Sequence, residues 1–371
     1  GGFGGIVTAV LRGTLDDATE IRIDAKNRDG APVTYNIRSV PAVRPQWDVT
    51  TLDSPAPGLI LLTPTQLVGA TTTGPAMLYI LDETGKLVYY ARTPFDPTDF
   101  DRVTLPNGLV RYTYLMQDAP LDWSKWPIEP ATAYVMDDHF RPLQTIRLAP
   151  SGSHDAFGLD VHEFRLLDDD HWISESYLSQ TVTNVPGYAT STVVDAVVQE
   201  VSAGSVLFDW GTTSVPALYT QSTDGNDFTD AKTPYADYTH LNSVEIDPAN
   251  GNLVVSLRHD DEILELDRAT GAIVWTLGGA GDEFGLAPAD RFSHQHHVRF
   301  VAPNDLTMFD NGNADQVTKL REYQLDPVGH TAQVVAAVTV DGHYSSAMGS
   351  FQKYAGRYFV GSVEREIPPP D

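Results

Sequence analysis

The chain has 371 residues, 42% of them hydrophobic and 20% charged, so it is long enough to bury a large core in one or several domains. Its 24 basic and 50 acidic residues give a net charge of −26, which argues against nucleic acid and anionic membranes as partners. The absence of cysteine excludes disulfides and a cysteine nucleophile, and no run approaches the roughly 20 apolar residues that a membrane helix needs.

Residues 1–48 are predicted to form a small N-terminal β unit that resembles a sandwich. Runs of β-forming residues at 6–11, 18–24 and 33–37 predict its strands. The first five residues lack a basic and then apolar leader, which is typical of a processed N-terminus and equally of a cytosolic protein.

Residues 49–371 are predicted to form a β-propeller, because no segment keeps a helical period and one β pattern recurs. Strand–turn–strand hairpins occur at residues 78–89, 133–144, 198–210, 263–275 and 322–330. They alternate with inner strands near residues 58–62, 101–114, 160–167, 240–257 and 296–309. Repeats of roughly 55 to 70 residues that end in such hairpins indicate propeller blades.

Five blades are readable in this pattern, and residues 345–363 begin a sixth. No outer hairpin for the sixth blade is evident before Pro368, so we expect that blade to be short or to be completed by another segment. The sequence therefore predicts an all-β protein in which a six-bladed β-propeller follows the N-terminal unit.

Histidines recur at the beginnings of the predicted inner strands, at His162, His240 and His296, and Arg258 ends the strand after His240. The first strand of each blade lines the central channel of a propeller, so we expect these side chains to converge. Alternation along a strand also predicts that His297 points away from His296, and that His294 shares the face of His296 unless it belongs to the loop that enters the strand. The remaining histidines are expected to be ordinary; they are His139, His154, His171, His259, His330 and His343.

Several motifs occur in a fixed order between about residues 50 and 365. They are Asp160–His162, His240–Val244, Ser256–Arg258, Ile273–Gly279, Gln295–His296, Phe309–Gly312 and Thr318–Tyr323. Together they resemble the arylsulfotransferase family, the aryl sulfate sulfotransferases that do not use 3′-phosphoadenylyl sulfate. The resemblance implies a six-bladed propeller with an N-terminal β domain.

The resemblance further implies that a sulfuryl group passes from an aryl sulfate ester to a phenolic acceptor through a sulfohistidine, without metal or cofactor. It places the nucleophile at His296, with His162, His240 and Arg258 around the transferring group and Asn242 in substrate binding. A neutral imidazole is a competent nucleophile, and a guanidinium matches the oxygens of a sulfate. We expect a secreted, periplasmic or extracellular protein, and leave its oligomeric state open.

Two other classes of function remain open from the sequence. One is a metalloenzyme in which His162, His240 and His296, with or without His294, hold a transition metal at the propeller axis. Arg258 argues against it, because a fixed positive charge disfavours a dication. The other is a non-catalytic extracellular propeller that serves as a scaffold or in adhesion.

Overall fold

A computed structural model of the chain describes residues 20–26, 32–38, 57–64, 76–120, 127–152, 154–229, 235–340, 344–354 and 357–362. The chain divides into two compact units, Gly1–Pro94 and Phe95–Asp371. The predicted boundary between residues 48 and 49 lies outside the described residues, as does the strand predicted at 6–11.

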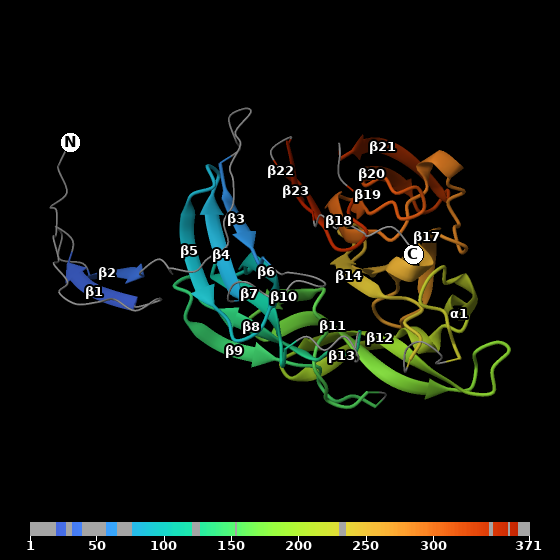
Figure 1. Cartoon of the computed structure of the whole chain (residues 1–371), viewed down its shortest axis with the longest axis horizontal. Helices are drawn as coiled ribbons and strands as arrows, with labels where there is room; N and C mark the ends of the chain where they lie inside the picture. The colour runs from blue at the N-terminus through green and yellow to red at the C-terminus, as the bar shows by residue number, and fades with distance from the viewer. Residues whose placement is uncertain are drawn as a thin grey trace, which may run out of the picture. The chain divides into compact units, whose positions relative to one another are not determined.

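The first unit contains two antiparallel sheets (Figure 1). Strands β1 (Glu20–Lys26) and β2 (Pro32–Arg38) pair as a hairpin and correspond to the strands predicted at 18–24 and 33–37. Strands β3 (Leu59–Leu62), β4 (Met77–Asp82) and β5 (Leu87–Arg92) form a three-stranded meander.

The second unit contains four antiparallel sheets of four strands, each in chain order, and one sheet of two strands (Figure 1). The first two sheets are β6 (Pro97–Thr104), β7 (Val110–Gln117), β8 (Ala131–Met136) and β9 (Pro142–Ile146), then β10 (Phe164–Asp168), β11 (His171–Val182), β12 (Ser191–Ser202) and β13 (Ser205–Gly211). The next two are β14 (Leu241–Ile246), β15 (Leu253–Leu257), β16 (Glu262–Leu266) and β17 (Ile273–Gly278), then β18 (His296–Ala302), β19 (Asp305–Asp310), β20 (Lys319–Asp326) and β21 (Thr331–Thr339). Strands β22 (Ser350–Tyr354) and β23 (Arg357–Gly361) follow as a hairpin.

Helical structure is sparse among the described residues. It comprises α1 (Leu218–Gln221) and three 3₁₀ turns at Thr212–Ser214, Arg258–Asp260 and Pro288–Asp290. None of the described helices is long and apolar enough to cross a membrane.

The all-β class and the propeller arrangement are confirmed, but the structure has five blades rather than the predicted six. Each predicted hairpin is present as a pair of adjacent strands: β4–β5, β8–β9, β12–β13, β16–β17 and β20–β21. The segment predicted to begin a sixth blade supplies only β22 and β23 among the described residues, and these two strands do not make a four-stranded blade.

Apolar side chains fill the space between neighbouring sheets. Val194 and Val198 of β12 belong to one buried cluster with Leu241 and Val244 of β14 and Val255 of β15. Each fully buried aliphatic side chain of this kind contributes about 1.5–3 kcal/mol to stability. Sheet-to-sheet packing therefore fixes the inner strands, from which the predicted site residues come.

Ion pairs connect three of these inner strands directly. Arg299 of β18 donates to Glu163, just before β10, at 2.7 Å, and its guanidinium lies 3.8 Å from Glu245 of β14. Arg165 of β10 reaches the same Glu245 at 2.9 Å. The nearby carboxylates raise the pKa of Arg299 although burial opposes this, so the guanidinium stays charged. Strands β10, β14 and β18 are thereby held close together.

We predict that Arg299→Ala lowers the free energy of unfolding by about 3–5 kcal/mol, because it leaves Glu163 buried without the guanidinium that binds both its oxygens, while Glu245 keeps Arg165. Arg141→Ala, which removes an exposed arginine paired with Asp137, is the control and should cost less than about 1 kcal/mol. Urea denaturation of both variants tests this. Equal losses in the two variants would show that the ion pairs do not hold the strands.

Candidate active site

The three histidines predicted to converge lie together in the second unit. His162 lies two residues before β10, His240 immediately precedes β14, and His296 is the first residue of β18. The ring centroid of His162 is 5.1 Å from that of His240 and 6.2 Å from that of His296. Tyr177 of β11 completes the cluster, with its ring 5.7 Å from that of His240. These four rings are called the histidine centre below.

Two histidines of the centre pair with aspartates close in sequence. Nδ1 of His162 lies 2.5 Å from an oxygen of Asp160, and Nδ1 of His240 lies 2.5 Å from an oxygen of Asp237. Because the carboxylates accept, both histidines donate through Nδ1 and direct Nε2 elsewhere. The aspartates lie two and three residues before their histidines, so the turns that enter the strands supply these pairs.

His296 has a different partner, which fixes its tautomer. Its Nδ1 lies 2.7 Å from Oδ1 of Asn311 and 3.1 Å from the carbonyl oxygen of His294. The amide group of Asn311 is oriented by two bonds that its Nδ2 donates, to the carbonyls of Ser345 at 2.7 Å and Met348 at 2.9 Å. Nδ1 therefore carries the proton, and the lone pair of His296 is on Nε2, where it accepts from the Met348 amide at 3.2 Å.

Gln295 and Asn242 anchor the backbone that carries His296. Nε2 of Gln295 donates to Oγ of Ser256 at 3.0 Å and to the carbonyl of Glu262 at 3.0 Å, so its side chain enters the neighbouring sheet. Asn242 of β14 donates to the carbonyl of Gln295 at 2.8 Å. Its Oδ1 is buried and has no hydrogen-bond partner among the described residues.

Arg258 also faces the histidine centre, and it contacts a turn at residues 345–349. Its Nη2 donates to the carbonyl of Ser346 at 3.0 Å. Gly349 lets this turn close onto the site, because its φ is +118° and a Cβ there would lie 2.4 Å from the ring of Phe309. Backbone groups of the turn thus contact both Arg258 and, through Met348, the Nε2 atom of His296.

The surroundings give the histidines different charges. Burial, reinforced by Arg258 and His162, lowers the pKa of His296 well below its ordinary value. Burial likewise lowers the pKa of His240, with His162 and Arg258 acting in the same direction. Burial also opposes the charged form of His162, but the carboxylate of Asp160 outweighs it and raises the pKa. The centre therefore favours the neutral form of His296 and the protonated form of His162.

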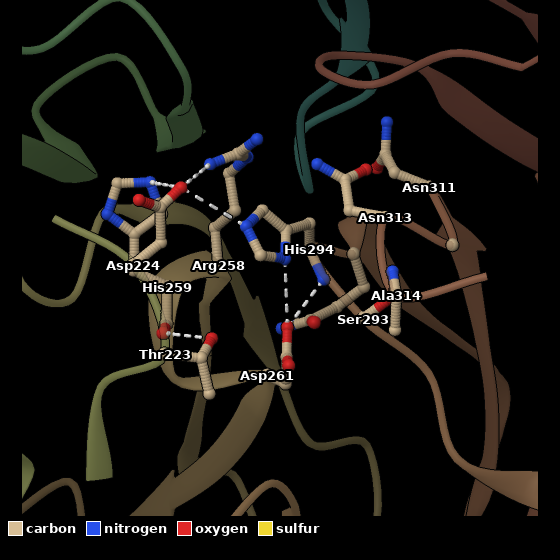
Figure 2. A network of polar contacts seen from close by, with 12 residues as sticks. Thr223, Asp224, Arg258, His259, Asp261, Ser293, His294, Asn311, Asn313 and Ala314 are labelled. Carbon is tan, nitrogen blue, oxygen red and sulfur yellow. Dashed lines mark hydrogen bonds and ion pairs between the residues drawn. The ribbon is translucent and has the colours of Figure 1, made fainter. Parts of the chain in front are cut away.

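His294 lies in the loop that enters β18, which is the second of the two expectations for it, and not on the strand face of His296. Its ring nitrogens lie 3.1 Å from Asp261 and 3.4 Å from Asp224 (Figure 2). Alternation does not apply here because β18 begins only at His296 and because His294 and His297 have φ values of +55° and +51°. The pairing register also shifts between His296 and Arg299. His297 instead accepts from the amide of Phe351 in β22 at 3.4 Å.

Sequence reasoning missed several residues of the site. His259, expected to be ordinary, stacks on His240 with a centroid separation of 4.7 Å. Asp237 could have been found from its position three residues before His240. Tyr177 has no local signal, because it lies on β11 and reaches the centre only through the packing of neighbouring sheets.

The structure does not favour a metal ion held by His162, His240 and His296. Among the described residues, one group at this site could hold an ion, and it consists of Asp237, His240 and His259. Of the histidines named for an axial metal, only His240 belongs to it. Asp237 and His240 are already joined by the direct contact at 2.5 Å. A second group, at Asp137, Asp138 and His139, lies in the turn after β8 and away from the centre.

Comparison with known proteins gives one family. The sequence matches the family model for arylsulfotransferase (ASST) over residues 139–365, a range that contains all the site residues described above. A comparison with curated proteins finds no match.

Two solved structures are similar at low identity. A protein of unknown function from Bacteroides caccae is 13% identical, with a TM-score of 0.41, covering 79% of this chain and 77% of that one. A putative 6-phosphogluconolactonase from Bacteroides fragilis is 12% identical, with a TM-score of 0.41, covering 81% and 72%. At these scores neither structure bears on function.

The geometry predicts that an oxyanion binds at Arg258 and the histidine centre. Sulfate should raise the melting temperature of the protein by mass action, and Arg258→Ala should abolish the rise. Arg268→Ala is the matched control, because Arg268 pairs with Glu200 on the outer strand β12. A thermal titration that gives the same rise in Arg258→Ala as in the unaltered protein would place the anion site elsewhere.

Proposed function

The chain belongs to the arylsulfotransferase family, and from this premise we propose that it transfers a sulfuryl group from an aryl sulfate ester to a phenolic acceptor through a sulfohistidine at His296. The proposal needs neither 3′-phosphoadenylyl sulfate nor a metal or other cofactor. The observation that carries it is the buried imidazole of His296, whose Nδ1 donates to Asn311 and whose Nε2 accepts from the backbone amide of Met348. Burial lowers its pKa and so favours the neutral ring.

In the first step, the Nε2 lone pair of His296 attacks the sulfur of the donor. An N–S bond forms while the bond from sulfur to the aryl oxygen breaks, and the aryl oxide leaves with that electron pair. His162 gives its proton to the leaving oxygen, a role that its raised pKa and the 6.2 Å separation of its ring from that of His296 support. Asn311 accepts from Nδ1–H throughout and stabilises the positive charge that the ring acquires.

Arg258 stabilises the charge on the sulfuryl oxygens during transfer. A guanidinium presents planar paired donors that fit two oxygens of a sulfuryl group, and burial strengthens this attraction by removing water. In the structure the carbonyl of Ser346 and the amide of Met348 contact Arg258 and His296. The sulfuryl group takes the place of these contacts when the donor binds.

The second step reverses the first with a new phenol. The acceptor oxygen attacks sulfur, the N–S bond breaks, and its electron pair returns to Nε2 of His296. The phenolic proton passes to His162, which is neutral after the first step and thus serves as the base. Both half-reactions then use the same residues, and the enzyme returns to its starting protonation state.

We predict that mixing the protein with 4-nitrophenyl sulfate alone yields an adduct of about 80 Da and a burst of phenol, because the first step needs no acceptor. His296→Asn should give no adduct, since asparagine keeps a polar group and removes the nucleophile. His297→Asn is the neighbouring control and should retain most of the adduct. Intact-mass spectrometry measures all three proteins.

An adduct that persists in His296→Asn and disappears in His297→Asn would show that His297, and not His296, is the nucleophile. The absence of adduct and turnover over a broad panel of aryl sulfates would favour a non-catalytic propeller.

The pH dependence of the burst follows from the two pKa shifts. The pKa of His296 is lowered, so the neutral nucleophile persists below the ordinary histidine value of about 6.5, and the burst should not fall as the pH drops through that value. The pKa of His162 is raised, so its proton is held above that value and lost as the pH rises further. Donors with poor leaving groups should therefore slow at alkaline pH more than 4-nitrophenyl sulfate does. A burst that halves near pH 6.5 would contradict the assignment of His296.

A further inference from the structure

The cations around the histidine centre are matched by carboxylates, although the centre must bind an anion. His162 pairs with Asp160, His294 with Asp261 and Asp224, and the nearest carboxylate to Arg258 is that of Asp224. The site therefore has no surplus of positive charge with which to attract a highly charged donor. Its net charge is set by residues that do not touch the sulfuryl group.

Asp224 differs from the other carboxylates because it faces solvent. Its side chain is 57% exposed, compared with 2% for Asp160 and 18% for Asp261. One oxygen of Asp224 lies 3.4 Å from Nε2 of His294, 3.8 Å from Nε2 of His259 and 4.0 Å from Nη1 of Arg258. Figure 2 shows this single carboxylate facing all three side chains.

The carboxylate of Asp224 is thus a negative charge of the protein itself, at the solvent-facing edge of the site proposed to bind the donor. The contact to Arg258 is too long for a hydrogen bond, so Asp224 does not occupy the guanidinium in the way that Ser346 does at 3.0 Å. It does place a negative charge beside the groups that a donor must approach. Interaction with His294 lowers the pKa of Asp224, so the carboxyl stays ionised at neutral pH.

We propose that Asp224 is a specificity-determining residue that restricts the donor to sulfate esters with a single negative charge. A second anionic group on the aryl ring adds a negative charge that the carboxylate of Asp224, 4.0 Å from Arg258, repels. The inference rests on the proposed function, because it names the donor class for the same site. Asp224 acts through charge and through Arg258 and His294, and it takes no part in the bond changes.

The expected size of the effect follows from Coulomb's law. Two like charges about 8 Å apart near a protein surface disfavour binding by roughly three- to thirtyfold, and salt reduces this. Removing Asp224 also leaves His294 less protonated, which works against the gain. This opposing loss is partial, because Asp261 still pairs with His294. We therefore expect the net change in binding to lie near the lower end of that range.

The kinetic test compares two donors that differ by one charge, 4-nitrophenyl sulfate and the same ester with a carboxylate on the ring. The unaltered protein should prefer the first by its kcat/KM. Asp224→Asn should reduce this preference about fivefold, mainly through KM of the dianionic donor, and lower salt should enlarge the effect. Asp224→Glu, which keeps the charge, should restore the preference.

Asp227→Asn is the matched control, because Asp227 lies three residues after Asp224 and its carboxylate accepts from the backbone amide and the hydroxyl of Thr229. An equal loss of preference in Asp227→Asn would overturn the proposal in favour of general surface charge. Turnover with an unchanged preference in Asp224→Asn would also overturn it, while leaving the proposed function intact.

A binding measurement separates the two proposals. Calorimetry with methyl sulfate, a monoanion, and inorganic sulfate, a dianion, needs no turnover. Asp224→Asn should tighten sulfate binding about three- to fivefold more than methyl sulfate binding, as the Coulomb argument requires. That result without any sulfuryl transfer would support the charge selection and refute only the proposed function. Equal changes for both anions would overturn the role of Asp224.

Discussion

The hydrogen bond from Nδ1 of His296 to Oδ1 of Asn311 is the contact on which the account of this site depends. The carbonyls of Ser345 and Met348 orient the Asn311 amide, so its oxygen and not its nitrogen faces the imidazole. With Nδ1 protonated and burial opposing a second proton, the ring keeps its lone pair on Nε2. A hydroxyl or thiol nucleophile would need a separate base to remove its proton before it attacks, whereas Nε2 of His296 carries no proton.

In this acidic protein, pairs of opposite charges occur both between the inner strands and around the candidate active site. At the level of the fold, Arg299 and Arg165 join Glu163 and Glu245 and hold the inner strands together. At the level of the site, carboxylates balance the cations, so a protonated histidine and an arginine coexist beside a neutral histidine without a strongly positive surface. The site is thus suited to a group that carries one charge and redistributes it during transfer.

The sequence predicted the propeller arrangement and the meeting of His162, His240 and His296, because repeating hairpins show where each inner strand begins. It did not predict the five blades, since β22 and β23 form only a two-stranded sheet where a sixth blade, short or completed by another segment, was expected. Alternation did not decide the position of His294, because that residue has a left-handed backbone conformation in the loop before β18. His259 and Tyr177 depend on contacts between neighbouring segments and sheets, which no local spacing records.

The protonation state of His296 tests the central claim most directly. In protein labelled with ¹⁵N in histidine, long-range proton–nitrogen spectra at neutral pH should show His296 as the neutral Nδ1–H tautomer, assigned by the signal that His296→Asn lacks. Addition of an aryl sulfate should then shift the Nε2 resonance of His296, because the sulfuryl group bonds to that nitrogen, while Nδ1 keeps its proton. A protonated imidazolium at neutral pH, or a tautomer with the proton on Nε2, would contradict the account.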